Sequence, residues 1–291
     1  MSISLPFKQV DVFTSKPFKG NPVAVTNCMG IEESEIPTSM LQSIASWTNL
    51  SETTFIFKPS SEEYDYKLRI FTPTSELTFA GHPTIGSCRA FMEFSNRQDS
   101  KKLLQECALG IVELTVDGDT ISFKAPKADI EDIEDEVIRA YENCLYTKFI
   151  HRPRLLHVGP DWVVCLVEDD KAAFNINPDF SLMSATNKRF GHIGIILGGK
   201  KKGSDNEYEM RAFAPSINVL EDPVCGSGSV ALSKYLQETH EFNPGVKLKI
   251  NQGGRINRSG RIDVSLGGHT GEIKYNIGGK ATTLINGEIK I

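Results

Sequence analysis

The chain of 291 residues lacks several features that would place it in particular protein classes. Basic residues do not outnumber acidic ones (32 against 37, a formal net charge of −5), so a nucleic-acid partner is not expected. No run approaches the roughly 18–20 apolar residues of a membrane-spanning helix, and the start has no basic segment followed by an apolar one, as a secretory signal has. We therefore expect a cytoplasmic protein with no membrane partner.

Cysteine is also scarce. The six cysteines are scattered, with no C-x-x-C pair, and this pattern fits neither a disulfide scaffold nor a zinc site. Hydrophobic residues make up 40% of the chain and charged residues 24%, which is typical of a globular protein. The length is sufficient for one large domain or two of ordinary size.

The most informative feature that the sequence does have is an internal repeat. Four pairs of segments recur in the same order at offsets of 140 to 142 residues: 69–73 with 211–215, 82–87 with 222–227, 21–25 with 161–165, and 120–123 with 261–264. Four matches in order are hard to attribute to chance. They predict two lobes of the same topology, residues 1–127 and 128–279, with the C-terminal strand 280–291 as a candidate to return to the first lobe.

Within each lobe the pattern favours strands over helices. Alternation of apolar and polar residues predicts strands such as 66–70, and Gly118 and Asn286-Gly287 are typical of hairpin turns. Helical spacing of apolar residues runs through 130–145. In both lobes the repeated Pro-x-x-Gly-Ser motif leads into an apolar helix, because proline is favourable in a first helical turn.

These two helix starts are the first candidates for a binding site. A helix start offers unpaired backbone N–H groups and the positive end of the helix dipole, which suit an anion, and small residues let a ligand approach. Two such starts facing each other across a cleft between the lobes would hold a carboxylate. In the second lobe the residues concerned are Gly226, Ser227, Gly228 and Ser229. The alternative is that the glycines only permit close packing of the helix on a sheet.

A titratable residue precedes the proline of each motif. These residues are His82 and Asp222, at equivalent positions of the two lobes, and together they could form two faces of a proton-transfer site. Glu52 is a third candidate, at the point where a helix gives way to the strand 53–57. Sequence alone leaves two interpretations of Glu52 open: a surface residue at the end of a strand, or a partly buried base.

Four separated segments, 11–25, 49–55, 69–83 and 221–228, together resemble the PhzF phenazine-biosynthesis-like family. The resemblance runs essentially from Val10 to the C-terminus and is close to the fungal members of that family. It implies a diaminopimelate-epimerase-like α+β fold, in which two pseudo-symmetric lobes each consist of a mixed β-sheet curled around a central helix.

The resemblance also implies a reaction and a homodimer. In the family's isomerase a glutamate moves a proton between carbons of a small carboxylated metabolite without metal or organic cofactor, and Glu52 matches that glutamate. His82, Asp222 and Ser227 match the accompanying polar residues, and Gly81 matches the small residue beside the bound ring. We therefore expect a cofactor-independent isomerase with no metal site.

Two other functions remain open beside this one. A non-catalytic metabolite-binding or scaffold protein could keep the same fold. An amino-acid epimerase or racemase would resemble the related enzymes that use two facing cysteines, one in each lobe. The counterpart of Cys225 in the first lobe is Ile85, however, which disfavours a paired-thiol mechanism.

Overall fold

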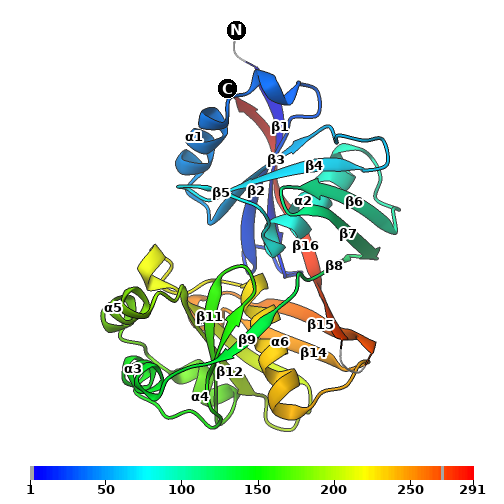
Figure 1. Ribbon diagram of the computed structural model, residues 1–291. Helices are drawn as coiled ribbons and strands as arrows, with labels where there is room; N and C mark the ends of the chain where they lie inside the picture. The colour runs from blue at the N-terminus through cyan, green and yellow to red at the C-terminus, as the bar shows by residue number, and fades with distance from the viewer. Residues whose placement is uncertain (1–2, 270–271) are drawn as a thin grey trace. The chain divides into compact units, whose positions relative to one another are not determined.

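The computed structural model describes residues 3–269 and 272–291, and the chain divides into two compact units (Figure 1). The N-terminal unit comprises Met1–Lys124 and Gly278–Ile291, and the C-terminal unit comprises Ala125–Ile277. Each unit combines a mixed sheet with helices, which confirms the predicted α+β class. Among the described residues no helix is long and apolar enough to span a membrane.

In the N-terminal unit a sheet curls around one buried helix. Its elements are β1 (Ser4–Val12), β2 (Asn21–Asn27), a 3-10 helix (Glu33–Glu35), α1 (Thr38–Thr48), β3 (Glu52–Phe57), β4 (Tyr66–Phe71), β5 (Glu76–Leu77), α2 (Gly81–Phe94), β6 (Lys102–Cys107), β7 (Gly110–Asp117) and β8 (Thr120–Lys124). The strand order is β1-β2-β3-β4-β6-β7-β8, and β16 (Glu272–Lys290) neighbours both β8 and β1. The sheet therefore closes around α2, which contacts β1, β2, β3, β4 and β8.

The C-terminal unit is built in the same way. Its elements are β9 (Asp129–Asp132), α3 (Asp135–Leu145), β10 (Arg154–His157), β11 (Asp161–Val167), α4 (Asp170–Asn175), α5 (Phe180–Phe190), β12 (Gly194–Lys200), β13 (Glu207–Phe213), a 3-10 helix (Pro215–Ile217), α6 (Gly226–His240), β14 (Lys247–Gln252), a 3-10 helix (Gly254–Ile256), β15 (Gly260–His269) and the first part of β16. The strand order is β9-β10-β11-β12-β13-β14-β15-β16, and α6 contacts β10, β11, β12 and β15.

The two units share one topology. β2 and β3 are parallel, β3 and β4 antiparallel, β4 and β6 parallel, and β6 and β7 antiparallel. The five strands from β11 to β15 repeat these four pairings in the same order. α1 and α5 precede the equivalent strands β3 and β12, while α2 and α6 follow β4 and β13. The internal repeat of the sequence is therefore a duplication of structure.

The recurring Arg-x-Phe segments keep the same ion pair in both units. The guanidinium of Arg69 makes two contacts of 2.7 Å with the Glu76 carboxylate, and Arg211 makes two of 3.0 and 2.8 Å with Glu221. Each guanidinium also lies over the ring of the phenylalanine two residues further on. The Arg211–Glu221 pair is buried, whereas the Arg69–Glu76 pair is partly exposed.

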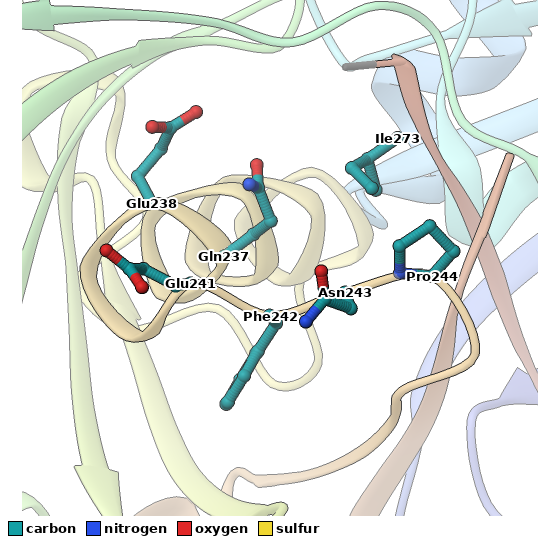
Figure 2. A pocket seen from close by; sticks show the side chains of 7 residues that line it. All are labelled: Gln237, Glu238, Glu241, Phe242, Asn243, Pro244 and Ile273. Atoms are coloured by element: carbon teal, nitrogen blue, oxygen red, sulfur yellow. The ribbon is translucent and has the colours of Figure 1, made fainter. Parts of the chain in front are cut away.

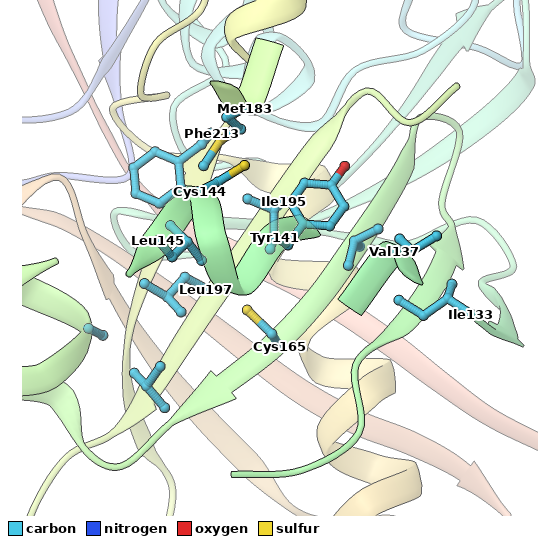
Figure 3. Packing of buried hydrophobic residues seen from close by; sticks show 13 residues of the cluster. Ile133, Val137, Tyr141, Cys144, Leu145, Cys165, Met183, Ile195, Leu197 and Phe213 are labelled. Carbon is cyan, nitrogen blue, oxygen red and sulfur yellow. The ribbon is translucent and has the colours of Figure 1, made fainter. Parts of the chain in front are cut away.

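The helix predicted from the apolar pattern of 130–145 is present only in part, in the core of the C-terminal unit (Figure 3). Val137, Tyr141 and Leu145 of α3 do pack in this core. The helix, however, begins only at Asp135, because residues 129–132 form the strand β9, which pairs with β10. Apolar spacing over so few residues does not distinguish the end of a helix from a short strand.

One predicted hairpin is present and the other is wrong. Gly118, with φ of +59°, lies in the tight turn between β7 and β8. Asn286-Gly287 forms no turn, because β16 runs straight through it and pairs with Lys8 and Phe7 of β1. The side chain of Asn286 accepts a hydrogen bond of 3.1 Å from Lys8 Nζ. Pairing with a distant strand thus overrides the local turn preference.

α2 lies directly on the sheet at Gly86. A Cβ atom at this position would come within 2.3 Å of Val23 Cγ1 and 2.9 Å of Val12 Cγ2. The absence of a side chain at Gly86 is therefore what permits this close packing of helix on sheet. Both neighbours are valines, and β-branched side chains have few alternative rotamers. A methyl group at Gly86 could therefore be accommodated only if the helix moved away from the sheet.

We expect Gly86→Ala to lower the free energy of unfolding by about 1–3 kcal/mol, because overpacking outweighs the better helix propensity of alanine. Urea denaturation of the purified protein measures this. Gly30→Ala is the matched control, since a Cβ atom there meets nothing within 4 Å. If Gly86→Ala is as stable as the wild type, the sheet rearranges at this point and the expected overpacking does not occur.

Candidate active site

Glu52 is the first residue of β3. The helix α1 ends at Thr48, and Asn49 then adopts a left-handed conformation (φ 55°) that is typical of the residue after a helix. Three residues later the chain enters the sheet, where Glu52 pairs with Val23 of the parallel strand β2. The Glu52 side chain is only 16% exposed. Of the two interpretations left open by the sequence, the structure supports a buried carboxyl group.

His82 lies against this carboxyl group. It is the second residue of α2, its side chain is 8% exposed, and its Nε2 is 3.3 Å from Glu52 Oε2. Gly81, the first residue of α2, is the neighbour of His82 in the chain. The N-terminal unit therefore brings together two of the three predicted catalytic residues, which are 30 positions apart in the sequence.

A hydrogen bond between strand and helix fixes this arrangement. The hydroxyl groups of Thr54, on β3, and Ser87, on α2, are 2.8 Å apart and fully buried. Thr54 also lies 3.2 Å from the carbonyl oxygen of Ala24. Neither residue of this pair is among the site residues predicted from the sequence. The alternation of side chains along a strand was the available signal, because it places Thr54 on the same face as Glu52.

Burial also sets the proton affinity of Glu52. Removal of the carboxyl group from water raises its pKa from an ordinary value of 4.5 to about 7, and a hydrogen bond with Ser51 opposes this shift more weakly. A group with such a pKa is present in both protonation states at neutral pH. It can therefore take up a proton and return it, which general acid–base catalysis requires.

Asp222 lies in the C-terminal unit, just before α6. Its carboxylate Oδ1 accepts a hydrogen bond of 2.9 Å from the backbone N–H of Val224, and its own N–H donates to Ala212 O at 2.9 Å. The residue is half-buried. The carboxylate is thus held by the turn that leads into the helix.

The start of α6 is arranged around Cys225, its N-cap residue. The Cys225 thiol accepts a hydrogen bond of 3.3 Å from the N–H of Gly228. Ser229 is fully buried, and its hydroxyl donates to Gly226 O at 2.6 Å. Gly228 and Ser229 therefore contribute to the helix start itself. No hydrogen bond to the N–H groups of Gly226 and Ser227 is found within the described part of the chain.

The hydroxyl of Ser227 has a defined orientation. Its oxygen accepts a hydrogen bond of 3.1 Å from Nε1 of Trp162, which is itself buried in the core. An indole N–H can only donate, so the Ser227 oxygen is the acceptor and its own proton stays available for a further contact. The Cys225 sulfur lies 3.5 Å from the same oxygen. Ser227 can therefore donate a hydrogen bond to an anion.

Neither a metal centre nor a second anion site accompanies these residues in the described part of the chain. In the ranges 3–269 and 272–291 no three His, Cys, Asp or Glu side chains lie together as metal ligands would. A surface hollow of about 290 Å³ lies at the far end of α6 from Asp222 (Figure 2). It is lined by Glu238 and Glu241 among other residues, and these carboxylates would repel an anionic metabolite.

Comparison with known proteins gives relatives over almost the whole chain. A protein of Schizosaccharomyces pombe named "Antisense-enhancing sequence 1" is 40% identical over 294 residues, which cover 97% of each chain. A protein of Pseudomonas fluorescens named "Trans-2,3-dihydro-3-hydroxyanthranilate isomerase" is 28% identical over 289 residues, 96% of this chain and 97% of the relative.

Comparison with solved structures supports the fold. The crystal structure of a Bacillus anthracis phenazine biosynthesis protein of the PhzF family matches with a TM-score of 0.84 and 22% identity, and the match covers 100% of both chains. At this identity the likeness establishes the fold alone, and it confirms the α+β architecture expected from the resemblance. The sequence model of the family described as "Phenazine biosynthesis-like protein" matches residues 10–287. The chain therefore belongs to the phenazine biosynthesis-like protein family, as its motifs implied.

Proposed function

We propose that the protein is an isomerase that moves a proton between carbons of a small carboxylated metabolite, with no metal or organic cofactor. The observation that carries this proposal is the buried Glu52 carboxyl group, which contacts His82 and has a pKa of about 7. Relatives over the whole chain that bear isomerase names support the same class of reaction. A homodimeric state and a cytoplasmic location belong to this proposal as well.

Glu52 acts first as a base and then as an acid. In its ionised form it removes a proton from a carbon of the substrate, and the resulting carboxylic acid returns the proton to a neighbouring carbon. His82, 3.3 Å away, stabilises the ionised form when it carries a proton itself. Because the pKa of the Glu52 carboxyl group is near neutrality, both the ionised base and the protonated acid are accessible at neutral pH.

The start of α6 holds the substrate carboxylate. The N–H groups of Gly226 and Ser227 lie at the positive end of the helix dipole, and the Ser227 hydroxyl adds a donor whose direction Trp162 sets. Gly228 and Ser229 shape this start and do not bind directly. Asp222 positions the substrate or relays a proton.

A second function is favoured by one specific observation. The name of the relative with 40% identity refers to antisense enhancement and describes no reaction. A metabolite-binding protein that catalyses no reaction could have the same buried Glu52 carboxyl group and the same start of α6. Thermal-shift measurement with aromatic and aliphatic carboxylic acids, followed by proton-exchange NMR on the compounds that bind, separates the two functions: binding without exchange would support the non-catalytic one.

We expect Glu52→Gln to fold normally and to lower the rate of substrate C–H exchange with deuterated water about 10²–10⁴-fold, because an amide cannot accept the proton. NMR of trans-2,3-dihydro-3-hydroxyanthranilate, the compound named for a relative, measures this exchange. Glu209→Gln is the matched control, since burial also raises the pKa of Glu209 to about 7. Exchange retained in Glu52→Gln would exclude Glu52 as the base.

The same substitution has a predictable effect on stability. The Glu52 carboxyl group ionises near pH 4.5 in the unfolded chain and near pH 7 in the folded one. Between these values the folded state binds more protons, so a rise in pH destabilises the wild type. We expect Glu52→Gln to gain up to about 3 kcal/mol over the wild type between pH 4.5 and pH 8. Urea denaturation at several pH values measures the difference, and a constant difference would mean that the carboxyl group is hydrated.

A further inference from the structure

The carboxamide of Gln252 joins the two ends of the turn Asp222–Cys225. Gln252 is the last residue of β14 and is 1% exposed. Its Nε2 donates a hydrogen bond of 2.8 Å to Asp222 O, and its Oε1 accepts one of 2.8 Å from Cys225 N. One side chain therefore fixes both the residue that carries the carboxylate and the N-cap residue of α6.

The turn Asp222–Cys225 packs tightly against the backbone that follows Gln252. A Cβ atom on Gly253, which has φ of +88°, would lie 2.5 Å from Pro223 O. A Cβ atom on Gly260 would lie 2.4 Å from a methyl group of Val224. The turn therefore has no room to move toward β14 and β15, and the two hydrogen bonds of Gln252 prevent it from moving away.

We propose that Gln252 is a positioning residue for the reaction. It touches neither substrate nor reacting atoms, and it acts by holding the Asp222 carboxylate and the first turn of α6, with Ser227, in their working places. This inference rests on the proposed function, because it assigns the carboxylate-holding role to the start of α6. A shift of about 1 Å in such groups can cost on the order of 100-fold in rate.

The first test replaces Gln252 with methionine, which has a similar length and cannot make either hydrogen bond. With trans-2,3-dihydro-3-hydroxyanthranilate as the probe, we expect kcat/KM for Gln252→Met to fall about 10- to 100-fold. The control is Asn187→Leu, which removes another buried amide of the same unit that donates to a backbone oxygen, Ile193 O, at 3.2 Å. It should keep kcat/KM within about threefold, although both variants lose thermal stability.

The second test distinguishes positioning from general loss of stability. In Gln252→Glu the introduced group can accept from Cys225 N, and it can donate to Asp222 O only when protonated. We expect the ratio of kcat/KM between this variant and the wild type to rise as the pH falls from 8 to 6. The ratio for Gln252→Met should stay constant. Because each ratio is taken against the wild type, the titration of Glu52 cancels.

The third test does not depend on turnover. In hydrogen-exchange mass spectrometry, peptides that cover residues 222–229 should exchange faster in Gln252→Met than in the wild type, and at the wild-type rate in Asn187→Leu. Unchanged protection would overturn the inference whatever the protein catalyses. Faster exchange with unchanged kcat/KM would overturn the catalytic role. Absence of wild-type turnover with every carboxylated probe would instead refute the proposed function.

Discussion

The contact between Glu52 and His82 depends on how closely α2 is seated on its sheet. Glu52 belongs to the sheet and His82 to the helix, so their separation of 3.3 Å is set by helix–sheet packing. Gly86 permits the close approach, and the Thr54–Ser87 hydrogen bond fixes the helix along the strand. A helix one residue out of register would separate the pair. Packing at this helix therefore controls the chemistry of the candidate site.

The duplicated fold supplies a scaffold in both units, but the candidate acid is present in only one of them. β12 begins at Gly194, as its equivalent β3 begins at Glu52. A Cβ atom on Gly194 would lie 2.0 Å from Phe213 O and 2.8 Å from the Trp162 ring. No side chain fits there. The C-terminal unit therefore has no space for an acidic side chain at the position equivalent to Glu52. Its Trp162 instead orients the Ser227 hydroxyl at the start of α6. Steric constraints thus explain why the two units offer different groups.

The sequence predicts the duplication and much of the fold, because these depend on patterns that recur along the chain. The places of His82 and Asp222 near the starts of α2 and α6 follow from the same repeat, although His82 lies within the first turn of α2 and Asp222 lies before α6. The burial of Glu52 could not be derived in this way, since it depends on contact with α2, whose His82 lies 30 positions further along the chain. The wrong hairpin at Asn286-Gly287 has the same origin, because β1, at the other end of the chain, is the partner of that segment.

Buried polar groups anchor the segment around Asp222 on both sides. Before it, Glu221 pairs with Arg211, whose guanidinium also donates to three backbone oxygens between residues 173 and 176. After it, Cys225 is held by Gln252.

A buried ion pair such as Arg211–Glu221 contributes little net stability, because desolvation offsets the attraction between the charges. Its partners are nevertheless held in a single geometry, since an unpaired charge in the interior would be costly. The segment that carries the Asp222 carboxylate is therefore held in one geometry from both sides. Fixed polar groups of this kind need little rearrangement when a ligand binds, and such preorganisation is a large part of the electrostatic contribution that a protein can make to catalysis.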